Sequence, residues 1–219
     1  MAERNRPAVA LVADIVGSRH LADRPAAQRQ IHEAFLRAER DVPALQAAWA
    51  TVGDEFQAVY RTWQDAMRST LRVAVLLPED VVLRYGLGEG ELRVVERRAE
   101  GDIHEGTAWY RARDAVDQAA GSQRPDGLAT AYLGPDPELT AALNAHLLLR
   151  DHVVGRLKAR ERRLIGHLLC GMTQTEAAQL EGVSQSAVSQ SVHRSGGAHL
   201  LEADALLLKD AQTGSRGDA

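Results

Sequence analysis

Apolar residues follow two different periods along the first 135 residues of the chain. Unbroken apolar runs predict buried strands, and apolar residues spaced by three and four predict amphipathic helices. The run from Pro7 to Val16 is the longest strand candidate, and its continuous apolarity indicates burial on both faces. Strands are expected over residues 7–16, 45–51, 56–60, 81–88, 91–96 and 128–133, and helices over residues 25–41, 62–77 and 106–120. This mixture predicts an α/β or α+β sandwich around one core.

Short glycine-containing segments separate two pairs of these strands. Val52-Gly53-Asp54-Glu55 lies between the second and third strands, and Gly88-Glu89-Gly90 lies between the fourth and fifth. Such segments between apolar runs predict two β-hairpins. His104 and Glu105 are expected in a loop before the third helix.

From Pro137 onward the pattern is only helical, so we place a domain boundary near residue 135. One domain is expected over residues 1–135 and a helical one over residues 136–211. The polar, Gly-rich residues 212–219 are expected to form a disordered tail. A last helix over residues 198–208 carries a leucine-rich face at Leu201, Ala205 and Leu208, beside Leu200 and Leu207.

Residues 157–194 predict three short helices with clear capping signals. Thr173 and Glu176 form a capping box at the start of the second helix, and Ser184 is the expected N-cap of the third. Gly182 can take the left-handed conformation that the turn between them requires. The pattern is typical of a helix-turn-helix.

The third helix divides into an apolar and a polar face. The residues expected to point inward are Ala178 of the second helix, Val183 of the turn, and Val188 and Val192 of the third helix. The outward residues are Gln185, Ser186, Ser189, Gln190, His193 and Arg194. Short polar and basic side chains on such a helix can reach base edges in the major groove, so these six are candidate DNA-binding residues. A capped helix pair also serves as a protein-docking module, and that alternative stays open.

Composition narrows the class of protein. A chain of 219 residues that is 45% hydrophobic and 26% charged is typical of soluble globular proteins. The single cysteine, Cys170, excludes an intrachain disulfide framework and a multi-cysteine zinc site. No apolar run approaches the roughly 18 residues of a membrane span, and the first apolar stretch does not resemble a signal peptide. We therefore expect a cytoplasmic protein with no membrane partner.

The net charge of −4 is unevenly distributed. Residues 1–150 hold 18 basic and 22 acidic side chains, whereas residues 156–194 hold six basic and three acidic ones. A locally basic segment favours a nucleic-acid partner, because phosphate contacts dominate that affinity. One copy would have a low affinity for DNA, and two copies in a dimer would reach an affinity sufficient for function.

Two aspartates lie where strands end. Asp14 ends the first strand and Asp54 lies in the next hairpin turn, so pairing of these strands would bring both carboxylates to one edge. Facing carboxylates favour a cation between them, and oxygen ligands suit Mg²⁺ or Mn²⁺ with phosphate oxygens. Backbone N–H groups that could hold a phosphate belong to Ile15, Val16, Gly17 and Ser18. By spacing alone, ordinary turn aspartates are the more common explanation.

Four segments resemble nucleotidyl cyclases in the same order. Residues 13–18 resemble the opening strand of class III cyclases, and residues 51–60 resemble their hairpin and the GGDEF motif of diguanylate cyclases. Residues 83–91 resemble the cyclase strand with the pattern Arg-x-Gly-Ile-x-x-Gly-Glu. Residues 106–113 resemble the helix that carries an asparagine and an arginine. Over its full length the chain is most similar to the SatD family.

The resemblance implies a ferredoxin-like, cyclase-type core that forms a homodimer. It implies that Asp14 and Asp54 bind Mg²⁺ or Mn²⁺, that residues 15–18 hold a triphosphate, and that Gly53 and Glu55 lie beside the nucleotide. Arg113 falls where cyclases have the arginine that stabilises the transition state. A pairing of Arg113 with Glu55, Glu89 or Glu91 is the alternative for this arginine.

Three positions depart from the cyclase pattern. Ala50 stands in place of the lysine that reads the base, Trp109 in place of the asparagine that orients the ribose, and Val52 in place of the first glycine of GGDEF. The phosphate and metal end is therefore kept, and the base and ribose end is lost. Trp109 could stack on a base, although core packing is the more common role of such a residue.

The helical part also resembles known families. Residues 176–184 resemble the helix-turn-helix of sigma factor region four and of LuxR-type regulators, with Ala177 and Glu181 as departures. The sequence thus predicts a DNA-binding transcriptional regulator whose cyclase-like part binds a nucleotide with a divalent metal. Two alternatives remain: a metal-dependent nucleotidyl cyclase or nucleotide-processing enzyme, and a non-catalytic dimeric protein-docking module.

Overall fold

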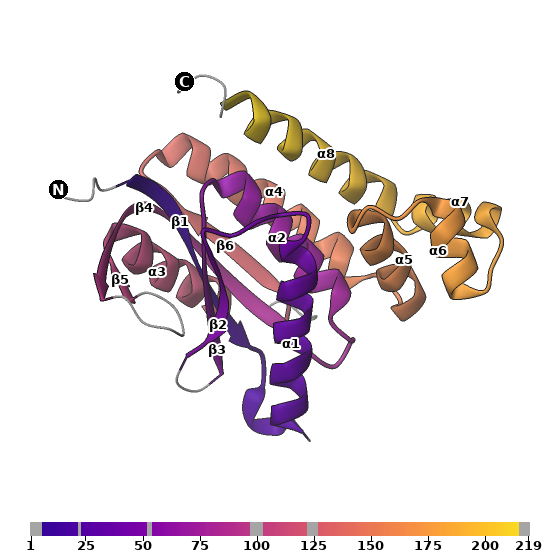
Figure 1. Ribbon diagram of the computed structural model, residues 1–219, viewed down its shortest axis with the longest axis horizontal. Helices are drawn as coiled ribbons and strands as arrows, with labels where there is room; N and C mark the ends of the chain where they lie inside the picture. Colours follow the sequence, from indigo (N-terminus) through magenta and orange to yellow (C-terminus); the bar gives the residue numbers. More distant parts are fainter. Residues whose placement is uncertain (1–5, 22, 52–53, 97–102, 122–126, 215–219) are drawn as a thin grey trace.

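A twisted β-sheet with helices on both faces forms the first part of the molecule, and further helices extend to one side of it (Figure 1). The computed structural model describes residues 6–21, 23–51, 54–96, 103–121 and 127–214. Its strands are β1 (Arg6–Ile15), β2 (Gln46–Ala50), β3 (Glu55–Tyr60), β4 (Leu83–Glu96), β5 (Ile103–Glu105) and β6 (Ala129–Leu133). Its α-helices are α1 (Arg24–Glu39), α2 (Trp63–Leu76), α3 (Thr107–Gly121), α4 (Pro137–Gly155), α5 (Ala159–Leu169), α6 (Gln174–Glu181), α7 (Gln185–Arg194) and α8 (Gly197–Gly214).

Strand β1 lies inside the sheet, antiparallel to β3 on one side and to β4 on the other. The strand order is β2-β3-β1-β4-β5, and β6 pairs in parallel with the first half of β4. The chain order β1-α1-β2-β3-α2-β4 is the β-α-β-β-α-β arrangement of a ferredoxin-like motif. The expected mixed α+β class is confirmed.

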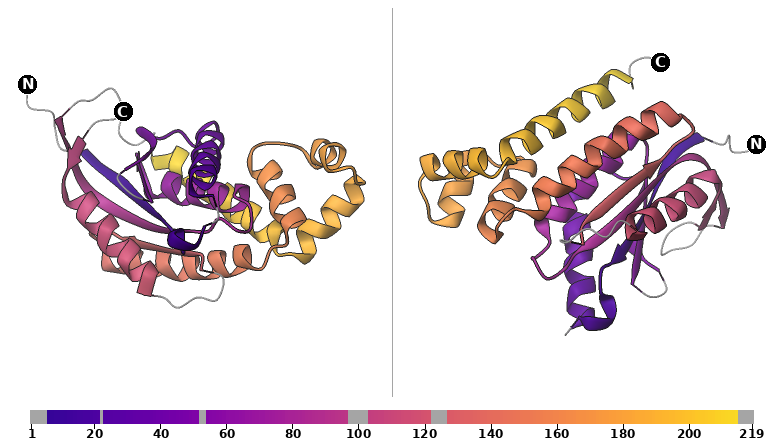
Figure 2. Two further views of the ribbon diagram at one scale, coloured as in Figure 1. Left: turned by 90° about the horizontal axis from the view of Figure 1, so that it is seen from below. Right: turned by 180° about the vertical axis from the view of Figure 1, so that it is seen from behind.

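Both faces of β1 are buried, as its continuous apolar run predicted. Val9, Leu11 and Ala13 face the large core that α1 and α2 cover. Ala10 and Val12 face the opposite side, where α3 packs (Figure 2). Since side chains alternate along a strand, one apolar run serves both helical layers.

The predicted hairpin at Gly88-Glu89-Gly90 is wrong, because β4 is one continuous strand of 14 residues. Gly86, Gly88 and Gly90 pair with alternate residues of β1 and lie under α3. A Cβ atom at Gly86 or Gly88 would lie only 2.2 Å from a backbone oxygen of α3. The glycines therefore serve the close approach of a helix to a strand, and not a turn.

The loop expected at His104 and Glu105 is also wrong. These residues belong to the short strand β5, which pairs antiparallel with the end of β4. An ion pair of 2.7 Å between Arg93 and Glu105 joins the two strands. The pairing joins residues that are twelve positions apart in the sequence, so the polarity of neighbouring residues does not predict it.

Helix α4 covers the outer edge of β6 with polar side chains. Asp151 accepts a hydrogen bond of 2.6 Å from the N–H of Thr130. Asn144 accepts one of 2.9 Å from the N–H of Tyr132 and donates one of 2.8 Å to its carbonyl. These bonds occupy backbone groups that an edge strand would otherwise offer to another chain.

Helix α8 is held to α2 by buried charges. Asp204 accepts hydrogen bonds from the guanidinium groups of Arg72, at 2.9 Å, and of Arg68, at 3.2 Å. Part of the expected apolar face of this helix is wrong, because Ala205 and Leu208 are exposed whereas Leu200 is buried. The helix places the face that carries Asp204 against α2, because a carboxylate that pairs with two buried arginines is itself buried.

The main hydrophobic core includes residues on both sides of residue 135. Leu147 of α4, Ile165 of α5 and Leu200 of α8 are buried together with residues of the sheet and of α2. The division at residue 135 stays a prediction. Helix α8 continues to Gly214, inside the segment expected to be disordered, and residues 215–219 lie outside the described residues. Among the helices described, none is long and apolar enough to cross a membrane.

Substitution of Gly88 by alanine is expected to destabilise the fold by about 3 kcal/mol, because the new methyl group overlaps backbone atoms of α3 that cannot move aside. Gly121→Ala is the matched control. A Cβ atom there meets nothing within 4 Å, so its free energy of unfolding should stay within about 1 kcal/mol of wild type. Urea denaturation of both variants measures the difference. Equal stability of the two variants would contradict close packing of α3 on β4.

Candidate nucleotide and metal site

Acidic side chains meet at one end of the central strands. Asp14 at the end of β1 lies opposite Glu55 of β3 in the antiparallel register, and opposite Arg84 of β4 on its other side. Asp54 directly precedes β3. The strand pairing therefore brings together the segments of both aspartates, as the sequence predicted. Gly53 and Val52 lie outside the described residues.

Each of these carboxylates has its own arginine. Arg113 of α3 donates to both carboxylate oxygens of Glu55, at 2.9 Å for one of the two bonds. A guanidinium nitrogen of Arg84 lies 3.9 Å from a carboxylate oxygen of Asp14. Arg24, in the first turn of α1, forms an ion pair with Asp54. The carboxylates and arginines form three pairs around one end of the sheet.

Asp14 is the carboxylate whose protonation the site alters most clearly. Partial burial raises the pKa of Asp14, and the nearby charges of Asp54 and Glu55 add to this rise, while Arg84 opposes it. The ionised form of Asp14 is therefore disfavoured by the folded structure. A cation beside Asp14 would favour its ionised form and so offset this cost in free energy.

The turn after Asp14 has the open backbone that a phosphate site requires. Gly17 has a φ of +64°, in the left-handed region, and a Cβ atom there would meet nothing within 4 Å. Ser18 begins a short 3₁₀ turn. Two members of the predicted turn are committed elsewhere: Ile15 is buried, and the N–H of Val16 donates to the carbonyl of Val82 at 2.9 Å. Among residues 15–18, Gly17 is exposed and Ser18 is half-buried.

Asp14 and Asp54 are the residues at this sheet end that could hold a divalent ion. In the described part of the chain, no group of three or more His, Cys, Asp and Glu side chains is placed to hold a metal ion. Asp14 and Asp54 supply two carboxylates, which is what Mg²⁺ commonly takes from a protein when phosphates and water complete its shell. Asp54 would have to exchange Arg24 for the ion.

Two of the three positions that depart from the cyclase pattern are described by the structure. Trp109 packs edge-to-face against Trp49 of β2, with ring centroids 6.1 Å apart. It is half-buried and packs against the small core under α3. Ala50 lines a separate cavity of about 430 Å³ between α1 and β2, beside Phe56 and His32.

Sequence reasoning missed Arg24 and Gln57 as members of this site. Gln57 donates to Glu55 at 2.8 Å and so helps to fix its carboxylate. Arg24 follows the helix-capping residue Asp23, which accepts a hydrogen bond from the N–H of Ala26. Glu55 and Gln57 are two residues apart in β3, so their side chains lie on the same face of the strand. This spacing is a signal from which the pairing could have been predicted. No local signal connects Arg24 with Asp54, thirty residues later.

Helices α6 and α7 have the predicted caps. Thr173 accepts from the N–H of Glu176 at 3.2 Å, and the carboxylate of Glu176 accepts from Thr173. Gly182 ends α6 with a φ of +64°, and Ser184 accepts from the N–H of Ala187 at 3.2 Å. Glu181, a departure from the regulator pattern, accepts hydrogen bonds from Arg163, which hold the pKa of this carboxyl below its usual value.

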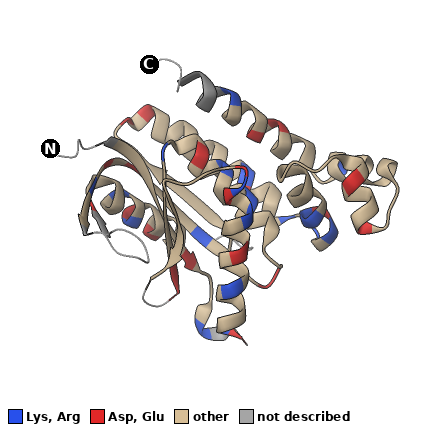
Figure 3. Ribbon diagram, viewed as in Figure 1, with Lys and Arg blue, Asp and Glu red and all other residues tan. Residues whose placement is uncertain are grey.

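The polar face of α7 is largely exposed, as the sequence predicted. Five of the six candidate residues are exposed, and Ser189 is half-buried; the exposed ones are Gln185, Ser186, Gln190, His193 and Arg194. Gln185 bonds Gln174 of α6 at 2.5 Å. Basic residues gather at the start of α5 (Figure 3). Of these, Arg162 is buried and Arg163 is paired with Glu181.

The fold and the paired charges define a mixed α+β protein with a ferredoxin-like sheet followed by a set of helices. The chain belongs to the SatD family, whose model matches residues 8–202. No curated protein matches it at a significant level.

Solved structures are similar to this chain over half of it or more, at low sequence identity. A bacterial light-regulated adenylyl cyclase is 14% identical with a TM-score of 0.46, over 59% of this chain and 77% of that one. The adenylyl cyclase CyaB from P. aeruginosa is 12% identical with a TM-score of 0.38, over 53% and 73%. A regulator of polyketide synthase expression from Bifidobacterium adolescentis is 14% identical with a TM-score of 0.30, over 99% and 83%. The site therefore rests on the contacts of this chain and not on these similarities.

Asp14→Asn is expected to raise the free energy of unfolding at pH 7, because it removes an ionised group that the folded state disfavours. A raised pKa means that this cost is absent below about pH 3.8, appears as Asp14 ionises, and is full above its folded pKa. The gain should be at most about 1 kcal/mol, since the side chain is 44% exposed.

Urea denaturation between pH 4 and pH 7 measures this effect, and the gain should shrink toward pH 4. Asp114→Asn, an exposed position on α3, is the control and should change stability by less than about 0.5 kcal/mol. A loss of stability in Asp14→Asn at pH 7 would show that attraction by Arg84 outweighs burial and repulsion.

Proposed function

We propose that this protein is a DNA-binding transcriptional regulator whose ferredoxin-like part binds a nucleotide together with Mg²⁺ or Mn²⁺. The observation that carries the nucleotide site is the cluster of Asp14, Asp54 and Glu55, each paired with an arginine, beside the open turn at Gly17. A cytoplasmic homodimer is part of the proposal.

The paired charges suit an exchange of partners when a nucleotide binds. Phosphate oxygens would accept hydrogen bonds from Arg113 and Arg24, which form strong, charge-assisted bonds with such groups. Asp54, released from Arg24, would hold the divalent ion together with Asp14, whose carboxylate lies 3.9 Å from Arg84. The ion, when bound, supplies positive charge that neutralises and orients the phosphates. Gly17 and Ser18 would add backbone contacts.

The structure of α5 to α7 supports DNA binding by a helix-turn-helix. Val188 and Val192 of α7 are buried in one cluster with Leu164 of α5 and Ala178 of α6, which holds α7 in place. The exposed side chains of Gln190, His193 and Arg194 can therefore enter a major groove together. Lys158 and Arg160, exposed at the start of α5, can contact phosphates. Two copies would read two half-sites, because one copy offers few phosphate contacts.

An enzyme is the second candidate function, and Arg113 is the observation that favours it. This arginine lies beside Glu55 and Asp14 at the proposed phosphate site, where it could stabilise charge on a reacting phosphate. Ala50 and Trp109, which replace the groups that read the base and orient the ribose, favour binding without cyclisation.

A turnover assay separates binding from catalysis. Purified protein is incubated with each of the four NTPs and with Mg²⁺ or Mn²⁺, and products are measured by LC–MS beside titration calorimetry. We expect metal-dependent binding of a nucleotide that stays intact, with affinity reduced at least about tenfold in the Asp14→Asn, Asp54→Asn double variant. Asp114→Asn is the control and should bind as wild type.

A cyclic or linked product formed by wild type and absent from the double variant would make this protein an enzyme. Absence of nucleotide binding with either metal would remove the nucleotide from the proposal. In that case the three charge pairs serve the stability of the sheet end only.

DNA binding is tested by selection of bound genomic fragments, followed by gel shifts at 50 mM and 200 mM salt. Gln190→Ala and Arg194→Ala are each expected to weaken binding about tenfold, because each removes a contact with a base or phosphate. Gln118→Ala, exposed on α3, is the control and should bind as wild type. No DNA affinity at low salt would favour the protein-docking alternative.

A further inference from the structure

Helix α4 is apolar on its outer side as well as on the side that packs against the fold. Leu143, Leu147 and Val154 are buried on the inner side. Seen from behind, the helix runs along the outside of the molecule (Figure 2). The exposed apolar residues in its middle part are Ala141, Ala142, Ala145, Leu148 and Leu149. A helix that is apolar all round is normally buried on all sides, so this outer face is typical of one that packs against a partner.

These exposed residues form one strip along the helix surface. Ala141, Ala145 and Leu148 follow one another at spacings of four and three, and Ala142 and Leu149 lie beside them. Two helices pack against each other along strips with this spacing. Leu148 is 52% exposed and Leu149 is 67% exposed. Their removal from water would therefore favour association of the strip with another apolar surface.

The two ends of the strip carry opposite charges. Glu138, in the first turn of α4, and Arg156, the residue that follows its last turn, are both exposed. They are about five helical turns apart, so both lie on the side of the helix that carries the strip. They are also equally far from Leu147 in the sequence. An antiparallel pair of α4 helices centred there would set Glu138 of each copy beside Arg156 of the other.

We propose that the outer face of α4 is the dimer interface of this protein, formed when α4 packs antiparallel against α4 of a second copy. In a two-fold arrangement each surface meets itself, so its opposite ends must be complementary, as Glu138 and Arg156 are. The alanines of the strip allow close approach of the helices, and the leucines fill the space beside them. The interface rests on the homodimer of the proposed function.

A membrane surface fits this face less well than a second copy does. Helices that lie on membranes carry basic residues beside their apolar face, because the lipid headgroups are commonly anionic. The first turn of α4 instead carries the carboxylate of Glu138. A second copy offers that carboxylate an arginine, and offers the strip an equal apolar surface.

The position of α4 gives the dimer a consequence for the rest of the chain. Helix α4 ends at Gly155 and α5 begins at Ala159, with the buried Leu157 between them. The interface would therefore lie next to the first of the three helices that carry the candidate DNA-binding face. It shares no residue with that face or with the candidate nucleotide site, so both stay open in the dimer.

Sedimentation velocity of the full chain over a range of concentrations tests the interface. A single helix pair is a small contact, so we expect a monomer–dimer equilibrium with a micromolar dissociation constant. Leu149→Glu should raise this constant at least about a hundredfold, because it places a charge against an apolar surface. Leu180→Glu on α6 is the matched control, since Leu180 is 61% exposed and lies outside the strip. It should dimerise as wild type does.

Exchange of the charges tests the antiparallel arrangement. At 50 mM salt, Glu138→Arg and Arg156→Glu should each weaken the dimer about tenfold, because each sets like charges together at both ends of the interface. The double variant restores opposite charges and should return to within about threefold of wild type. Both positions are exposed, so these variants should fold.

The outcomes separate this interface from the homodimer itself. A wild-type chain that stays monomeric at all concentrations would remove both. A wild-type dimer that Leu149→Glu does not weaken would overturn the interface alone, because the two copies would then meet elsewhere. Failure of the double charge exchange to restore the dimer would overturn the antiparallel arrangement.

Discussion

The arrangement of this protein depends on one helix that is buried on nearly every side. Helix α2 lies between the sheet and the helices α4, α5 and α8, so even its polar residues are removed from water. Arg68 and Arg72 can be buried there because Asp204 of α8 pairs with both of them, and the carboxylate of Asp65 lies 3.9 Å from Arg68. Arg150 of α4 adds bonds of 3.2 and 3.0 Å to Met67 and Thr70 on the same helix. Because an unpaired buried charge is costly, these contacts fix where α4 and α8 lie.

A second constraint acts on the other face of the sheet. The glycines of β4 let α3 approach the strand backbone, and this approach carries Arg113 to Glu55 at the end of β3. The same row of small residues leaves little room for α3 to shift, since any Cβ on this face would meet helix backbone. The position of Arg113 is therefore a consequence of packing under α3, and its pairing with Glu55 at the sheet end depends on that packing.

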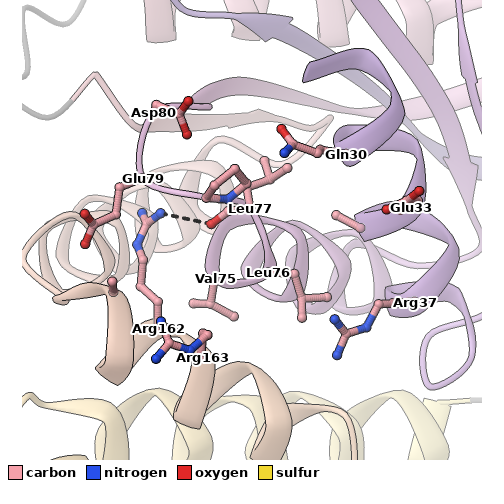
Figure 4. Close-up of a pocket in the computed structure, with 13 residues that line it drawn as sticks. Gln30, Glu33, Arg37, Val75, Leu76, Leu77, Glu79, Asp80, Arg162 and Arg163 are labelled. Atoms are coloured by element: carbon pink, nitrogen blue, oxygen red, sulfur yellow. Dashed lines mark hydrogen bonds between the residues drawn. The ribbon is translucent and has the colours of Figure 1, made fainter. Parts of the chain in front are cut away.

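Helix α1 extends from the sheet end to a cleft of about 620 Å³ beside α5 (Figure 4). Arg24, in the first turn of this helix, pairs with Asp54 at the sheet end, whereas Arg37, in its last turn, lines the cleft. A movement of α1 would therefore alter both regions. Most of the fold around them could be predicted from apolar periodicity, but the continuity of β4 and the short strand β5 could not. Glycines at alternate positions predict a turn when the helix that covers them is not known.

The sequence by itself determined what depends on near neighbours: the helix caps at Thr173 and Ser184, the left-handed Gly182, most of the strands, and the presence of Asp14 and Asp54 at strand ends. Caps and periods act over three or four residues, so the local sequence contains them. Only the tertiary structure decided which arginine neutralises which carboxylate, and that α8 turns Asp204 inward. Those pairs join residues up to 136 positions apart, and burial of the charged groups, which forces them to meet, arises only when the whole chain has packed.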